Sequence, residues 1–157
     1  MARLLVPGYR EEMHMSDYSK MPWPVVGVGD RGPLVKAAQR LLVAEGAKLE
    51  IDGTFGSATK KAIENHQKRR NLSVDGQLGK KTWPTLVPVL KRNDRGEAVL
   101  AAQELMGNDG GVDFDGIFGA KTEAAVRATQ GTAPGTKLDG ILGHQTWSIL
   151  LSMFDRT

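Results

Sequence analysis

Apolar positions follow the period of an amphipathic helix in two stretches of the chain that match each other. The first stretch follows the phrase Asp30-Arg31-Gly32-Pro33, and its apolar stripe consists of Val35, Ala38, Leu41 and Leu42. The second follows Asp94-Arg95-Gly96, and its apolar stripe consists of Val99, Ala102, Leu105 and Met106. Asp30 offers an acceptor to the free amides of a helix start and Pro33 suits a first turn, while Gly46 and Gly107 are typical helix ends. The pattern predicts two equivalent helices.

Two further helices are predicted in each half of the chain. The second helix has one face formed by Thr59, Ala62, Ile63 and His66, and its copy by Thr122, Ala125, Val126 and Thr129. A shorter third helix contains Trp83 and Leu86, and its copy contains Trp147, Leu150 and Leu151. Strand patterns are weak and confined to residues 49–51 and 112–114. The chain is therefore predicted to be all-α.

An eight-residue phrase, Asp-Gly-x-(Phe/Leu)-Gly-x-x-Thr, occurs four times between these helices. The glycine after each aspartate supplies the positive φ of a tight turn, and the aspartate can accept a backbone amide two residues later. The predicted structural turn residues are Asp52, Gly53, Asp75, Gly76, Asp115, Gly116, Asp139 and Gly140. The Phe or Leu of each phrase is predicted to point inward as an anchor, namely Phe55, Leu78, Phe118 and Leu142.

The four phrases fall into two pairs, each a Phe version followed by a Leu version, so the chain is an internal duplication. Repeat one is assigned to residues 27–90 and repeat two to residues 91–157. Residues 1–26 are predicted to form an N-terminal extended arm, with Trp23 docked on the module. A unit of about 60 residues buries only a modest fraction of its surface. Two tandem three-helix modules that pack against each other are therefore expected.

Charge distinguishes the two repeats more than the rest of the composition does. The net charge is +3, of which repeat one carries +5 and repeat two carries −2. There are no cysteines, which excludes disulfides and thiolate chemistry. The apolar runs are too short for a secretory signal or a membrane span, so we expect no encoded export route and no membrane insertion. The two copies have diverged at their surfaces while keeping one internal pattern.

At these residues the chain resembles the peptidoglycan-binding-domain family, whose members are small three-helix wall-binding modules. The shared pattern is a first helix with Ala-Gln, the Phe phrase, a second helix ending in Gln, and the Leu phrase followed by Trp. It covers residues 27–90 and 91–154 in order. The chain departs from the family before the Gln of the second helix, where the usual aromatic is replaced by His66 and Thr129. The resemblance implies binding of cell-wall peptidoglycan.

The inventory of reactive side chains argues against catalysis. The three histidines form no His-Glu-x-x-His arrangement, and no cysteine can act as nucleophile or ligand. The repeated aspartates are accounted for by turns, and the calcium-like phrase Asp113-x-Asp115-Gly116 lacks the closing Glu. His66 lies on an apolar stripe, where a hydrogen-bonded core residue is favoured over a metal ligand. The chain is therefore predicted to be no enzyme and to hold no metal or cofactor.

Candidate ligand-binding residues lie where turns lead into helices. They are Lys60, Lys61, Lys80, Lys81, Lys121, Gln67, Trp83 and Trp147. Lysines beside unpaired helix amides could bind stem-peptide carboxylates or anionic wall polymers, although solvated surface lysines are favoured because exposed dipole effects stay below ~1 kcal/mol. The tryptophans could stack on sugars, but closure of each core is favoured. The basic run at residues 68–70 is assigned to capping of a helix end, and nucleic-acid binding is not expected.

Two functions remain open at this point. The leading hypothesis is a non-catalytic peptidoglycan-binding protein that targets or anchors at the bacterial cell wall, with peptidoglycan or an anionic wall polymer as partner. The alternative is a structural component of a phage particle or contractile injection machine, in which the same fold contacts other proteins of the assembly. Repeat one, which holds four of the five candidate lysines, is expected to dominate attachment to the wall.

Overall fold

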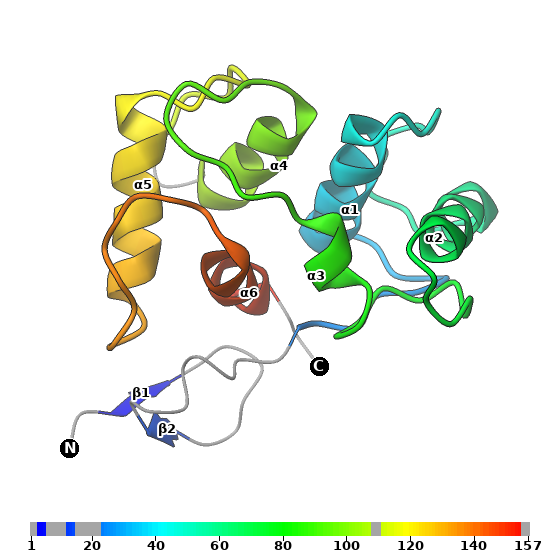
Figure 1. Cartoon of the computed structure of the whole chain (residues 1–157), viewed down its shortest axis with the longest axis horizontal. Coiled ribbons are helices and arrows are strands. Elements are labelled where there is room, and N and C mark those ends of the chain that lie inside the picture. The colour runs from blue at the N-terminus through cyan, green and yellow to red at the C-terminus, as the bar shows by residue number, and fades with distance from the viewer. Residues whose placement is uncertain (1–2, 6–11, 15–22, 108–110, 155–157) are drawn as a thin grey trace.

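The structure is a computed structural model that describes residues 3–5, 12–14, 23–107 and 111–154. Its helices are α1 (Pro33–Ala44), α2 (Ser57–Arg69), α3 (Trp83–Leu86), α4 (Glu97–Met106), α5 (Ala120–Gly131) and α6 (His144–Ser152). Helices α1 and α4 lie side by side in the middle of the molecule, with α2 and α5 at opposite ends (Figure 1). The predicted helical fold of two tandem three-helix modules is confirmed, with α1–α3 in repeat one and α4–α6 in repeat two.

The N-terminal segment contains two short strands. Strand β1 (Arg3–Leu5) pairs antiparallel with β2 (Glu12–His14). The remainder of the predicted arm before Trp23 lies outside the described residues, and Trp23 itself is partly buried against the hydrophobic core, as predicted. The strands weakly indicated at residues 49–51 and 112–114 do not form, because the backbone pairing of each repeat occurs at its turns instead.

The start of α1 differs from the prediction. Its N-cap residue is Gly32, whose φ of 118° and ψ of −161° place it in a region that only glycine adopts readily. Asp30 does not cap the helix, because its Oδ2 accepts the N–H of Gly27 at 2.8 Å and closes the preceding turn. Asp94 does the same with the N–H of Lys91 in repeat two. The Asp-Arg-Gly phrase thus forms a turn before the helix.

The third helices of the two repeats, α3 and α6, differ in length because a proline follows α3. Helix α3 has 4 residues, whereas α6 has 9. Val87, directly after α3, is extended with φ −77° and ψ 126°, because the following Pro88 disfavours the helical conformation in the residue before it. Ser152 occupies the equivalent position in repeat two, and α6 continues to that residue.

The predicted anchors form the core of each repeat. The four residues that follow the Asp-Gly pairs are at most 1% exposed: Phe55, Leu78, Phe118 and Leu142. Trp83 and Trp147 are 0% exposed. Their indole Nε1 atoms donate to the carbonyl oxygens of Pro24 at 2.8 Å and Pro88 at 2.7 Å. Each tryptophan therefore ties the segment that leads into its repeat to the core of that repeat.

This leading segment belongs structurally to the repeat that follows it. Val26 exchanges two backbone hydrogen bonds with Leu78, both at 2.9 Å, and Leu90 does the same with Leu142 at 3.0 and 2.8 Å. The residues just before positions 27 and 91 are therefore joined by backbone hydrogen bonds to the repeat that follows them. A backbone pairing of only two residues leaves no pattern of side chains, so it could not be predicted from the sequence.

The two repeats share one hydrophobic core and a charged interface. Arg40 of α1 lies 2.9 Å from both Glu97 and Glu104 of α4, and its guanidinium lies 5.1 Å from the ring centre of Phe114. Burial disfavours the charged form of Arg40, but its two carboxylate partners outweigh burial and raise its pKa above the ordinary value. Buried apolar residues of both repeats form one continuous cluster. The expected packing of one module on the other is therefore present.

Candidate ligand-binding site

A buried glutamine holds each of the four Asp-Gly turns. In the Phe turn of repeat two, Nε2 of Gln103 donates to Asp115 Oδ1 at 3.1 Å, and to the Ile117 carbonyl and Thr122 Oγ1 at 3.0 Å each. Its Oε1 accepts the N–H of Gly116 at 2.9 Å. The same bonds recur in the other turns around Gln39, Gln67 and Gln130. Because all four glutamines are at most 2% exposed, each turn is fixed by a buried polar network.

The four turn aspartates act as ionised acceptors within their own turns. In each turn Oδ1 accepts the backbone N–H two residues later at 2.9 Å. This hydrogen bond is the main reason that the pKa lies below the ordinary value at Asp52, Asp75, Asp115 and Asp139. The nearby glutamine amide lowers the pKa further. The aspartates were predicted to accept backbone amides within their own turns, and these hydrogen bonds have that geometry.

Acid is expected to destabilise the fold partly through these aspartates. Because their folded-state pKa lies below the unfolded value of about 3.9, ionisation stabilises the fold above that pH. The contribution is lost as the pH falls towards the folded-state pKa. The double replacement Asp75→Asn and Asp139→Asn should therefore flatten the fall in Tm between about pH 5 and pH 3, measured by circular dichroism. Equal slopes in the variant and the wild-type chain would contradict this account.

The structure places all five candidate lysines on the surface. Two lie near the start of α2, two in the turn before α3 and one at the start of α5: Lys60, Lys61, Lys80, Lys81 and Lys121. Lys60 Nζ lies 3.9 Å from Glu64 Oε1, and Lys121 Nζ lies 3.4 Å from Asp113 Oδ2. Both are exposed ion pairs, which contribute little to stability.

The other three candidates lie in the interior. Gln67 is 1% exposed, its Nε2 donates to Asp75 Oδ1 at 2.8 Å, and its Oε1 accepts the N–H of Gly76 at 3.0 Å. Trp83 and Trp147 are 0% exposed, and their N–H groups are already bonded to carbonyl oxygens. This placement does not support their predicted role as ligand contacts. The amide of Gln67 and the indole N–H groups of the tryptophans already form hydrogen bonds within the protein.

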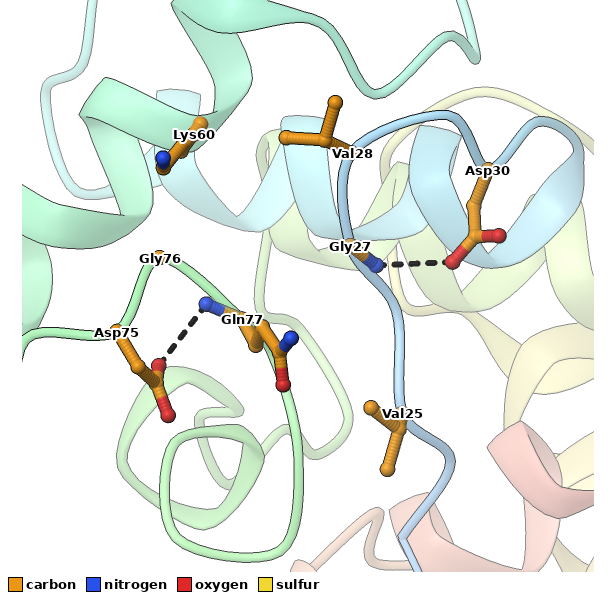
Figure 2. A pocket seen from close by; sticks show the side chains of 8 residues that line it. All are labelled: Val25, Gly27, Val28, Asp30, Lys60, Asp75, Gly76 and Gln77. Carbon is orange, nitrogen blue, oxygen red and sulfur yellow. Dashed lines mark hydrogen bonds between the residues drawn. The ribbon is translucent and has the colours of Figure 1, made fainter.

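A pocket of about 430 Å³ opens beside Lys60 in repeat one. The segment 25–30 forms one wall and the Leu turn at residues 75–77 forms the other, with Lys60 of α2 beside the turn (Figure 2). Backbone hydrogen bonds fix both walls, since Val26 pairs with Leu78 and the N–H of Gly29 donates to Phe55 at 3.0 Å. The pocket is therefore part of the folded module.

Charges of both signs line this pocket beside apolar side chains. Asp30 and Asp75 each use one carboxylate oxygen within their own loop, at 2.8 and 2.9 Å from a backbone nitrogen. Lys60 supplies the cation, and Val25 and Val28 at 61% and 65% exposure supply apolar contact area. Such a lining can bind an amphipathic ligand that carries both a carboxylate and an amine.

Five pocket residues were not among the predicted site residues: Val25, Gly27, Val28, Asp30 and Gln77. No local pattern marks them, because the pocket forms only where a segment of the chain runs beside a turn much later in the sequence. Comparison of the repeats supplies one signal, since Arg92 stands in repeat two where Val28 stands in repeat one. A change of charge within a repeated framework indicates a surface that has diverged.

In repeat one, a cluster of polar side chains surrounds the buried His66. His66 is 0% exposed, with Nδ1 2.7 Å from Glu45 Oε2 and Nε2 2.9 Å from Thr85 Oγ1, which is the hydrogen-bonded core role predicted for it. Burial raises the pKa of Glu45, but His66 and Arg70 outweigh burial and lower it. Thr129 occupies this position in repeat two, beside a pocket of about 530 Å³ lined by apolar residues that include Leu105, Met106 and Phe154. Among the described residues that line that pocket, none is charged.

Neither a metal site nor a membrane span is found in the described part of the chain. No group of three His, Asp or Glu side chains there is placed to hold a metal ion. No described helix combines the length and the apolar character needed to cross a bilayer.

The fold and the pocket together define a protein of tandem helical binding modules. The family model of the peptidoglycan binding domain matches residues 31–86 and 95–150, one match in each repeat. The chain belongs to the peptidoglycan binding domain family. This membership supports association with the cell wall, with peptidoglycan as the partner.

Several known proteins are similar to parts of the chain. An uncharacterized protein of the bpoA1 3′ region in Kitasatospora aureofaciens is 45% identical over 71 residues, which cover 43% of this chain and 59% of that protein. A peptidoglycan-binding protein from Clostridioides difficile, solved in complex with glutamine hydroxamate, is 44% identical over 40% of this chain and 39% of its own, with a TM-score of 0.39. The endolysin of Burkholderia phage AP3 is 31% identical over 68% of this chain and 38% of its own, with a TM-score of 0.40. The match spans less than two thirds of each of these proteins.

Proposed function

We propose that the chain binds peptidoglycan without cleaving it, as a wall-targeting or anchoring protein that attaches mainly through repeat one. The observation that carries the proposal is the tandem match to the peptidoglycan binding domain family over residues 31–86 and 95–150. The pocket beside Lys60 adds a surface with groups suited to the carboxylates and amines of wall peptides. The family match does not favour the alternative of a phage or injection-machine component.

The chemistry of the pocket supports binding rather than cleavage. Glycoside hydrolysis commonly needs one carboxyl group with a raised pKa as proton donor, beside an ionised partner. The N–H of Gln77 instead lowers the pKa of Asp75, and Asp30 is tied to the N–H of Gly27. Both carboxylates thus serve their own loops, which favours a rigid recognition surface.

The distribution of charge supports attachment through repeat one. This repeat carries +5 against −2 for repeat two. Four exposed lysines lie on the turn-to-helix junctions of repeat one: Lys60, Lys61, Lys80 and Lys81. Their attraction for carboxylates should weaken with salt, because the Debye length falls from ~10 Å at 0.1 M to ~3 Å at 1 M.

The intact chain is expected to sediment with purified sacculi, and less so as salt rises from about 0.1 M to 1 M. Because the four lysines of repeat one supply most of the predicted attraction, their joint replacement by glutamine should reduce binding more than Lys121→Gln does. The fraction of protein that sediments with the sacculi measures both effects. The intact chain is required because the two repeats share one core.

Two controls complete the sacculus experiment. Circular dichroism of each variant confirms that it is folded, and the supernatant is assayed for soluble muropeptides and reducing ends. Failure of the folded wild-type chain to sediment would overturn the proposed function. Release of wall fragments above that of a heat-denatured sample would overturn its non-catalytic part.

A further inference from the structure

The two repeats differ at the place where repeat one has its pocket. In repeat one, Val28 of the leading segment faces Lys60 of α2 across the opening (Figure 2). In repeat two, Arg92 and Glu123 occupy the equivalent positions, and Arg92 Nη1 lies 3.1 Å from Glu123 Oε2. The ion pair joins two side chains whose counterparts in repeat one, a valine and a lysine, cannot form one.

The glycine of each Leu turn shows that Lys60 and Glu123 are true structural counterparts. A Cβ on Gly76 would lie 2.9 Å from Cγ and Cε of Lys60, and a Cβ on Gly140 would lie 2.8 Å from Cγ of Glu123. Both side-chain stems therefore cross the turn at the same glycine. They diverge beyond it, where one ends in a cation beside a pocket and the other in a carboxylate bound to arginine.

A second arginine strengthens the closed arrangement in repeat two. Arg127 Nη2 lies 3.3 Å from Glu123 Oε1, and its Nη1 donates to the carbonyl of Leu138 near the Leu turn. Repeat one has Glu64 at the position of Arg127, only 3.9 Å from Lys60. The Arg92–Glu123–Arg127 cluster, here called the latch, thus reverses the charges of Lys60 and Glu64 and adds an arginine where repeat one has Val28.

We propose that the chain has one wall-ligand site, the pocket beside Lys60 in repeat one, and that the latch closes the equivalent site in repeat two. The ligand is a stem peptide, with a carboxylate on Lys60, an amine beside Asp30 and Asp75, and apolar groups on Val25 and Val28. Two carboxylates in the lining repel a polyanion, so an anionic wall polymer is excluded from this pocket. The inference rests on the proposed function and specifies its site, stoichiometry and ligand class.

The sequence of repeat two supplies the variants that test the site. Val28→Arg, Lys60→Glu and Glu64→Arg together transplant the latch into repeat one, using residues that the same framework already holds in repeat two. Arg92→Val, Glu123→Lys and Arg127→Glu together make the reverse exchange. Lys48→Glu is the matched control, because it reverses an exposed charge of repeat one that does not line the pocket and is not one of the candidate binding lysines.

Titration calorimetry of the full chain with a soluble muropeptide, a disaccharide carrying one stem peptide, measures affinity and stoichiometry. We expect one site per wild-type chain, and at least about a tenfold loss of affinity in the transplanted variant, as for loss of a charge-assisted contact. Lys48→Glu should bind like the wild type, and the reverse exchange should give two sites. The peptide-free disaccharide and a soluble poly(glycerol phosphate) should not bind.

Several outcomes would overturn the inference while leaving the proposed function intact. They are two sites in the wild-type chain, unchanged affinity in the folded transplanted variant, one site in the folded reverse exchange, or sedimentation with sacculi but no affinity for the muropeptide. Binding of the peptide-free disaccharide or of the poly(glycerol phosphate) would equally contradict a stem-peptide site. Loss of sacculus binding in the wild type would instead overturn the proposed function.

Discussion

Replacement of Phe118 by alanine is expected to lower the free energy of unfolding by about 3–5 kcal/mol, the usual result of emptying a buried aromatic site. Phe118 is 0% exposed, and its backbone pairs with Asp94 and Asn93 on the segment that leads into repeat two. The turn is held rigidly by Gln103, so the core has little freedom to collapse into the space. Chemical denaturation followed by circular dichroism measures the loss.

A second phenylalanine in the same stretch provides the control. Phe114 is 54% exposed and contacts Arg40 through its ring, so Phe114→Ala should cost at most about 1 kcal/mol. Because one hydrophobic cluster runs through both repeats, Phe118→Ala should also shift a single transition rather than unfold repeat two alone. Equal losses in the two variants would contradict the assignment of Phe118 as an anchor.

The features that the sequence predicted are local ones. The positive φ values of Gly53, Gly76, Gly116 and Gly140, between 70° and 74°, are what Asp-Gly turns demand. The burial of each Phe or Leu follows from its fixed place after such a turn, and the helices follow from their apolar stripes. Each of these properties depends on a few neighbouring residues. Because each property recurs in every copy, the repeated sequence predicts it more strongly than a single copy would.

The features that the sequence did not predict depend on contacts between distant segments. Asp30 was expected to cap α1, but it bonds to Gly27 because the chain turns before the helix begins. Arg40 joins α1 to α4, although nothing in its own helix indicates Glu97 or Glu104 as partners. The mutual orientation of two helices is not encoded in the pattern of either one, so such interfaces escape a sequence-based prediction.

The pocket of repeat one escaped prediction for the same reason, although the repeats contained a usable signal. The charges at Lys60 and Glu64 are reversed at Glu123 and Arg127, within a framework that keeps its glycines, anchors and glutamines. This divergence at one surface cluster, within a retained core, is the basis of the functional difference that we propose between the two repeats. The two lysines of the Leu turn in repeat one, Lys80 and Lys81, do not line the pocket, so we expect them to contribute only long-range electrostatic attraction.

The glutamine networks could have been found from sequence, since a glutamine precedes each Asp-Gly phrase in the preceding helix. Gln39 and Gln103 precede the Phe turns, whereas Gln67 and Gln130 precede the Leu turns. Considered alone, Gln67 fits a ligand contact as well as it fits a structural role. A residue that recurs before all four turns fits a role in the turns better than a role in one site.

Replacement of Gln103 by leucine is accordingly expected to lower the free energy of unfolding by at least about 2 kcal/mol. The change leaves the N–H of Gly116 and Oγ1 of Thr122 without their partner in the interior, and each such buried group costs about 1–3 kcal/mol. Gln145→Leu, at an exposed position of α6, is the matched control and should stay within about 0.5 kcal/mol of the wild type. Denaturant titration of both variants measures the difference.

Gln103→Glu separates the hydrogen-bond network from simple loss of volume. The new carboxylate keeps an acceptor for Gly116, but it replaces the Nε2 donor that lies 3.1 Å from Asp115 Oδ1 in the wild-type chain. Repulsion between the two carboxylates should raise the folded-state pKa of the new group above the unfolded Glu value of about 4.3. Its destabilising effect should therefore be largest at neutral pH and should shrink, relative to the wild type, as the pH falls through that raised pKa. A penalty that is independent of pH, or that is no larger than the penalty of Gln145→Leu, would show that Gln103 does not hold the turn through its amide.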